Sequence, residues 1–293
     1  MKTYLDCIPC FFNQALHAAR IAEASETDQK KILIEIGKIL PKFSLNCSPP
    51  EIARVIYKLV REKTHLEDPF KNIKIESNKI ALGIYDKLKE KVKNSKDGLL
   101  TAVELAIAGN IIDYGVNNSL DINKEIEKIL NFEDKNIKNG KRAFFAYDKF
   151  KEALESADTI LYLADNAGET VFDRILIEEI KTLYKEKQII YAVKERPIIN
   201  DALLEDAVVC GIDKIAEVVS SGLDSPGTIP SLCSKKFLTI YQNADMIISK
   251  GQGNFEALSE EIGPIFFLFM AKCPMVAKGL GCKIGDVFLL SQS

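Results

Sequence analysis

The stretch Thr159-Ile-Leu-Tyr-Leu-Ala-Asp-Asn-Ala-Gly-Glu169 decides the fold of this chain. Its first six residues predict a buried strand, and Gly168-Glu169 then opens a helix with apolar positions at helical spacing, namely Phe172, Ile175, Leu176, Ile180 and Leu183. Asp165 and Asn166 therefore follow the carboxyl end of a strand, where open α/β sheets bind their ligands. A carboxylate beside an amide oxygen suits a hard divalent cation, although the same pair is typical of an Asx turn or a helix cap.

The alternation of strands and helices continues from this stretch to the C-terminus. Further strand-like runs, separated mostly by helical stretches, occupy residues 188–193, 215–220, 245–249, 265–271 and 286–290. This order predicts an α/β fold, with a Rossmann-like, mostly parallel sheet and helices on both faces, in a metal-binding catalytic domain over residues 141–293. Residues 1–140 instead show apolar positions at helical spacing, which predicts an N-terminal all-helical domain or cap.

The composition limits the possible classes of function. The chain has 293 residues, of which 47% are hydrophobic, and a net charge of −3, which argues against binding nucleic acid by bulk charge. No run reaches the about 18 apolar residues that a membrane span needs, and the first residues do not resemble a signal peptide. Seven scattered cysteines are typical of a reducing compartment, so we expect a cytoplasmic protein. The oligomeric state cannot be predicted.

Polar residues also follow the later predicted strands. Asp201 precedes a helix, where it is either a cap or a third oxygen ligand turned toward Asp165. Lys250 ends a strand and is followed by a glycine turn and by Asn254, which enters a helix; glycines and helix N-termini favour bound anions. Lys272 follows the most hydrophobic strand, where it either extends to solvent or acts. Together, two lysines and neighbouring oxygen donors predict a site for a metal and a phosphate group.

Five other residues each have more than one interpretation. Asn110 and Asp113, spaced as i and i+3, either reach the cleft from the helical part or form a buried polar pair. Glu169 is either a favourable anion at a helix start or a partner of the metal ligands. Cys7 and Cys10 form a C-x-x-C motif, which is typical of half a zinc site or a redox pair but also of a packed helix face.

With these motifs the sequence resembles the DUF89 family, whose damage-control phosphatases share a metal-binding domain with a proposed acidic-residue methyltransferase. The resemblance covers nearly the whole chain, and its Cys7-Ile-Pro-Cys10 motif is similar to the microbial branch. The motifs that carry it are Cys7–Cys10, His65–Phe70, Ala108–Gly115, Asp165–Glu169, Asn200-Asp201, Ser221-Gly222, Ser249–Glu256 and Lys272-Cys273.

The resemblance implies a metal-dependent phosphatase that acts on small phosphorylated metabolites, such as sugar phosphates or damaged phospho-metabolites. It assigns the divalent metal to Asp165, Asn166 and Asp201, and catalysis to Asp165 with the phosphate-contacting lysines. The substrate-binding residues that it implies are Lys250, Lys272, Asn254, Ser221 and Asn110. Only two histidines are present, which favours magnesium or manganese over a histidine-built zinc site, while cobalt or nickel could also occupy such a site.

Three observations bear on alternative reactions. The family's Arg-Thr-x-Lys segment is replaced here by Phe269-Met-Ala-Lys272, so the substrate preferences of that branch do not transfer. Ala167 stands where haloacid-dehalogenase chemistry would need a second aspartate. An S-adenosylmethionine-dependent carboxyl methyltransferase would need a glycine-rich turn after the first strand, which the sequence lacks. A non-catalytic metal- or metabolite-binding protein stays open, as does the choice between a metal-activated water and a covalent aspartyl intermediate.

Overall fold

The computed structural model describes residues 1–109 and 144–292 of the chain. Its helices before the sheet are α1 (Cys7–Ile21), α2 (Glu26–Ile39), α3 (Pro49–Thr64), α4 (Lys71–Gly83), α5 (Tyr85–Lys93), α6 (Gly98–Ala108) and α10 (Tyr147–Ser156). The strands are β1 (Thr159–Leu163), β2 (Gln188–Val193), β3 (Glu217–Ser220), β4 (Met246–Lys250), β5 (Ile265–Met270) and β6 (Val287–Ser291). Between and after them lie α11 (Glu169–Leu183), α12 (Leu204–Val209), α13 (Lys235–Asn243), α14 (Gln252–Leu258) and α15 (Pro274–Leu280).

The six strands form one sheet in the order β3-β2-β1-β4-β5-β6. All neighbouring pairs are parallel except β5 and β6, which are antiparallel. The strand order reverses between β1 and β4, and this switch point is where an open α/β sheet leaves a crevice at its carboxyl edge. The predicted α/β fold with a mostly parallel sheet is confirmed.

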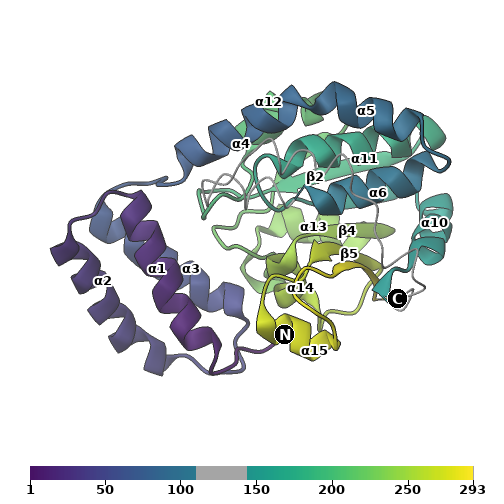
Figure 1. Cartoon of the computed structure of the whole chain (residues 1–293). Coiled ribbons are helices and arrows are strands. Elements are labelled where there is room, and N and C mark those ends of the chain that lie inside the picture. The colour runs from purple at the N-terminus through teal and green to yellow at the C-terminus, as the bar shows by residue number, and fades with distance from the viewer. Residues whose placement is uncertain (110–143, 293) are drawn as a thin grey trace.

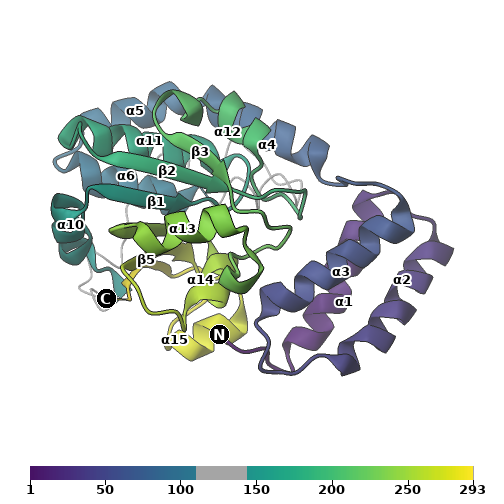
Figure 2. The ribbon, with the colours of Figure 1, turned by 180° about the vertical axis from the view of Figure 1, so that it is seen from behind.

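Helices cover both faces of the sheet (Figures 1 and 2). Because side chains alternate along a strand, Ile160 and Tyr162 of β1 belong to one core and Leu161 and Leu163 to the other. The first core is completed mainly by α5, α6, α10 and α11, and the second by α13, α14 and α15. Both faces of the central strands are therefore buried, as their continuous apolar sequences predict.

The helices α1, α2 and α3 pack around a core of their own. They lie together at one side of the sheet and its covering helices, and in both views they form a separate layer (Figures 1 and 2). An N-terminal helical region is thus present, but α4–α6, which the sequence placed in the same helical part, pack on the sheet side. The predicted domain boundary at residue 140 lies outside the described residues and stays a prediction.

Two arginines of α3 connect this helical layer to the carboxyl edge of the sheet. Arg54 and Arg61 both form ion pairs with Asp224, which lies in the segment after β3. Arg61 also donates a hydrogen bond to the carbonyl oxygen of Pro197, after β2, at 2.8 Å. The layer is therefore fixed over the strand ends. Within the described residues, no helix is long and apolar enough to cross a membrane.

Candidate functional site

The loops after β1 and β2 bring the three predicted metal ligands together. The amide of Ala202 donates to the Asp165 carbonyl at 2.8 Å, and the amide of Ala167 donates to the Asn200 carbonyl at 2.9 Å. Asn166 and Asp201 consequently pair as an isolated antiparallel bridge. Asp165, Asn166 and Asp201 are all buried, and all three line the same cavity. Of the two interpretations of Asp201, the structure shows the residue next to Asn166 and not as the cap of α12, which begins at Leu204.

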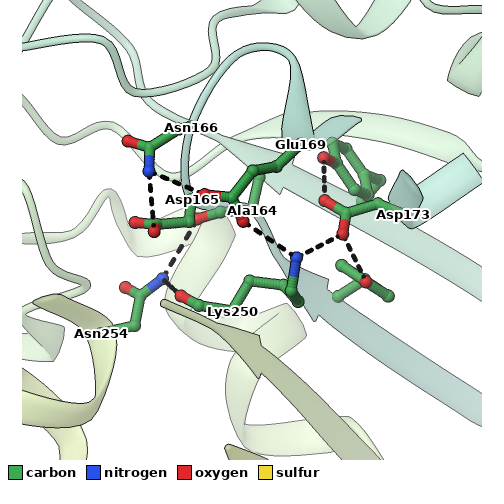
Figure 3. Close-up of polar contacts among 9 residues, drawn as sticks. Ala164, Asp165, Asn166, Glu169, Asp173, Lys250 and Asn254 are labelled. Carbon is green, nitrogen blue, oxygen red and sulfur yellow. Dashed lines mark hydrogen bonds and ion pairs between the residues drawn. The ribbon is translucent and has the colours of Figure 1, made fainter. Parts of the chain in front are cut away.

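Negative charge accumulates at this point. Burial, followed by the neighbouring carboxylates of Glu169 and Asp201, raises the pKa of Asp165 well above its usual value, and the positive charges of Lys272 and Lys250 only partly offset this. The Asn166 amide nitrogen donates to Asp165 Oδ2 at 3.0 Å and to Glu169 Oε1 at 2.8 Å, so its carbonyl oxygen points away from both carboxylates (Figure 3). Oxygen donors with excess negative charge suit a divalent cation.

Lys250 lies beneath these ligands rather than in the cavity wall. Its Nζ is 2.7 Å from Asp173 Oδ1 and 3.2 Å from Glu169 Oε2, and the side chain is fully buried. Burial alone would lower the pKa of Lys250, but the carboxylates of Asp173 and Glu169 outweigh burial and raise it. The structure therefore places Lys250 as a counter-ion inside the fold, and not among the residues that line the cavity.

The sequence interpretation missed Asp173, on which this network centres. The hydroxyl groups of Tyr162 and Tyr191 donate to its two carboxylate oxygens at 2.7 and 2.8 Å. Asp173 stands four residues after Glu169 on the buried face of α11, so both carboxylates point to the same side of the helix. Acidic residues at i and i+4 among apolar positions were the available signal.

Asn254 and Ser221 serve as connections between backbone segments. Asn254 donates to the carbonyl oxygens of Ala164 and Lys250 at 3.1 and 2.8 Å, and its own carbonyl oxygen accepts from the amide of Thr228. The Ser221 hydroxyl donates to the carbonyl oxygen of Val193 at 2.9 Å. Neither residue is among those that line the cavity. Asn110 and Asp113, also predicted near the site, lie outside the described residues.

The turn after β4 requires a glycine at position 251. Its φ is +82°, and a Cβ atom at this position would lie 2.0 Å from Asp165 Oδ2. The backbone of the turn consequently touches the Asp165 carboxylate directly, and no residue with a side chain fits there. The starts of α14 and α11 thus meet at Asp165.

The cavity has a volume of about 600 Å³ and lies between α1, α3 and the strand ends. Its floor holds the three predicted ligands, and Lys272 and Glu256 also line it. Most of the remaining wall is apolar and comes from Phe11, Pro49, Pro50, Ala53, Tyr57, Ile199, Pro226 and Met275. A concave site with an apolar wall and a few convergent polar groups is typical of small-molecule binding.

Cys7, Cys10 and Cys273 line the same cavity. Cys7 is buried in the core of α1–α3, whereas Cys10 is exposed, and burial raises the pKa of both thiols. Among the described residues, no three His, Cys, Asp or Glu side chains are placed to hold a metal ion. The zinc interpretation of the C-x-x-C motif therefore gains no support, and the predicted metal set remains two carboxylates and one amide.

Comparison with known proteins identifies the family of this chain. Residues 3–287 match the family model of the damage-control phosphatase ARMT1-like domain. The chain belongs to this family. The resemblance inferred from the motifs is thereby confirmed for the damage-control phosphatase family as a whole.

Relatives within the damage-control phosphatase family match over nearly their full lengths. A damage-control phosphatase of Pyrococcus horikoshii is 37% identical over 96% of this chain and 94% of its own, and one of Archaeoglobus fulgidus is 32% identical over 98% of both. An uncharacterized protein of Methanocaldococcus jannaschii is 37% identical over 100% of this chain and 96% of its own. The crystal structure of a DUF89 family protein from Pyrococcus horikoshii matches with a TM-score of 0.88, at 33% identity over 100% of both chains.

Because of Glu256, we expect the free energy of unfolding of this protein to depend on pH. Burial raises the pKa of its carboxyl group to about 7, while a hydrogen bond from Gln252 lowers it less. The folded protein therefore keeps a proton that the unfolded chain has released, so stability falls as pH rises from about 4.5 through 7. We expect Glu256→Gln to gain roughly 2–3 kcal/mol of unfolding free energy over wild type between pH 5 and pH 8.

Urea denaturation at several pH values measures this difference. Glu155→Gln is the matched control, because Glu155 is an exposed residue of α10. The control should stay parallel to wild type over the whole pH range. A constant gap between Glu256→Gln and wild type would contradict the buried placement of this carboxyl group.

Proposed function

We propose that this chain is a divalent-metal-dependent phosphatase that hydrolyses small phosphorylated metabolites, such as sugar phosphates or damaged phospho-metabolites. The observation that carries the proposal is the convergence of Asp165, Asn166 and Asp201 on the floor of a cavity that Lys272 also lines. The names of the Pyrococcus and Archaeoglobus relatives support the phosphatase class. Magnesium, manganese, cobalt or nickel would suit the oxygen donors.

The three ligands fit such a cation because two carboxylates and an amide oxygen meet beside a third carboxylate, that of Glu169, with Lys194 Nζ 3.6 Å from Asp201 Oδ2. Asp165 carries a raised pKa next to two other carboxylates, and Asn166 is held with its amide nitrogen toward Asp165 and Glu169. The remaining Asn166 carbonyl oxygen and the two aspartates are then the donor set. A bound divalent cation would neutralise phosphoryl charge and lower the pKa of a coordinated water.

The other residues of the site prepare it for a phosphate group. Lys272 would bind the phosphate, since phosphoryl transfer depends mainly on positioning and on stabilisation of negative charge. Lys250 would act indirectly, by holding Glu169 and thus the amide of Asn166 in place. The apolar wall formed by α1 and α3 would exclude water and receive the uncharged part of the metabolite.

Phosphate release from p-nitrophenyl phosphate tests the proposal. Enzyme stripped of metal should be inactive, and magnesium, manganese, cobalt or nickel added back should restore turnover. The same preparations are offered S-adenosylmethionine and a carboxylate acceptor, because methyl transfer would show a different activity. Failure of every metal to produce phosphate from this ester and from a panel of sugar phosphates would contradict the proposed function.

A further inference from the structure

The loop that carries Lys272 is held by one side chain from another element. Lys272 and Cys273 follow β5, and their backbone amides donate to Gln252 Oε1 at 2.9 and 3.0 Å. Gln252 is the first residue of α14, twenty positions earlier in the chain. A single side-chain oxygen thus accepts hydrogen bonds from the backbone of both residues, one of which is the lysine that lines the cavity.

Glu256 fixes which end of the Gln252 amide faces this loop. Gln252 Nε2 donates to Glu256 Oε1 at 2.7 Å, one helical turn along α14. A reversed amide would direct its N–H donors at the two backbone donors of the loop and, once Glu256 is ionised, would leave that carboxylate facing an oxygen. The amide orientation is therefore specified from both sides.

The same helix start also touches the proposed metal ligands. Gly251 packs directly on the Asp165 carboxylate, and the next residue, Gln252, holds the backbone of Lys272. The dipeptide Gly251-Gln252 therefore joins the carboxylate cluster to the lysine loop through one rigid turn. Any acceptor could satisfy the two backbone amides, but Gln252 also fixes Lys272 relative to Asp165, because it follows Gly251 directly.

We propose that Gln252 is the residue that positions Lys272 for the phosphate group of the substrate, and that Glu256 positions Gln252. This inference rests on the proposed function, since it assigns Lys272 to the phosphate. Gln252 itself is a positioning residue that acts through the backbone of Lys272, although it also lines the cavity.

Substitutions of Gln252 and Glu256 test the inference through phosphate affinity. Gln252→Ala should raise the KM for p-nitrophenyl phosphate and the inhibition constant of inorganic phosphate by about tenfold, with a smaller change in kcat. The reason is that the two hydrogen bonds that hold the backbone of Lys272 and Cys273 are lost. Gln252→Glu still accepts from both amides but places its charge against Glu256, so an increase of about fivefold is expected.

The double variant Gln252→Glu with Glu256→Gln reverses the pair. The new carboxylate accepts from both loop amides, and the new amide at position 256 donates to it, so both constants should return to within about twofold of wild type. Ser25→Ala is the matched control, because it removes a comparable side-chain acceptor from the amide of Asp28 at the start of α2. This control should leave both constants unchanged.

Hydrogen–deuterium exchange separates this inference from the proposed function. The amides of Lys272 and Cys273 should exchange faster in Gln252→Ala and regain protection in the double variant, whether or not the protein hydrolyses phosphate esters. Lost protection with an unchanged phosphate inhibition constant in an active enzyme would overturn the positioning role. Unchanged protection in Gln252→Ala would overturn it as well, whereas lost protection in a protein without phosphatase activity would contradict the proposed function alone.

Discussion

Asp165→Asn is expected to reduce metal-stimulated phosphate release at least about 100-fold and to make the metal-free protein more stable at pH 7. The loss of activity follows because Asp165 is the proposed ligand at which the loops after β1, β2 and β4 meet. The amide has the shape of the carboxylate, so it leaves the contact with Gly251 in place while it removes the charge.

The gain in stability follows from the sign of the pKa shift. Burial and the carboxylates of Glu169 and Asp201 raise the pKa of Asp165 in the folded protein. The unfolded chain loses this proton at lower pH than the folded protein does, so the ionised group costs folding free energy once the pH passes the unfolded value. The advantage of Asp165→Asn over wild type should therefore grow as the pH rises.

Thermal unfolding with and without manganese measures the two effects in one series. Manganese should raise the Tm of wild type and have little effect on Asp165→Asn, while the variant should melt above metal-free wild type. Asp148→Asn, which changes an exposed carboxylate in α10, is the control and should behave as wild type in both assays. Equal phosphatase activity in Asp165→Asn, or an equal Tm shift with manganese, would remove Asp165 from the proposed metal site.

The strands and the position of Asp165 and Asn166 were predictable because their signals are local. A central parallel strand is buried on both faces, so β1 and β5 are nearly continuous apolar runs that the sequence shows directly, and β4 is apolar up to Ser249. Polar residues that follow such strands must lie at one edge of the sheet. This geometry predicts Asp165 and Asn166 at that edge, whereas Asp201 had two interpretations and the set of three came from the family resemblance. The structure brings the three residues to one cavity.

The partners of helices and the directions of long side chains were not predictable in the same way. The apolar stripe of α6 shows that one face is buried but does not specify α11 and the sheet as its partner. Lys250 ends a strand beside a glycine turn, and this position is as compatible with binding an anion as with a buried counter-ion. Only the ion pairs with Asp173 and Glu169, which are distant in the sequence, decide between these.

Replacing Lys250 by Met is expected to lower the free energy of unfolding by about 3–5 kcal/mol. The lysine and its two partners are fully buried, so the variant leaves two carboxylates, Glu169 and Asp173, without their cation in the interior. Urea denaturation at pH 7 measures the loss. Lys89→Met is the control, because Lys89 pairs with Glu178 near the surface and its loss should cost less than about 1 kcal/mol.

A second substitution tests whether charge, and not the shape of the side chain, causes this loss of unfolding free energy. Asp173→Asn added to Lys250→Met removes one of the unpaired charges, and the new side-chain carbonyl can still accept from Tyr162 or Tyr191. We expect the double variant to recover about 1–2 kcal/mol relative to Lys250→Met. An additive loss in the double variant would contradict a direct ion pair between the two residues.

The same variant also tests the role that the family resemblance implies for Lys250. A lysine that contacts the phosphate would, when replaced, raise the KM for a phosphate ester while the protein stayed as stable as wild type. A buried counter-ion would instead release Glu169, whose carboxylate accepts from the amide of Asn166, so stability and kcat would fall together. The geometry favours the second pattern, because the Nζ group of Lys250 lies between two carboxylates inside the fold and the lysine that lines the cavity is Lys272.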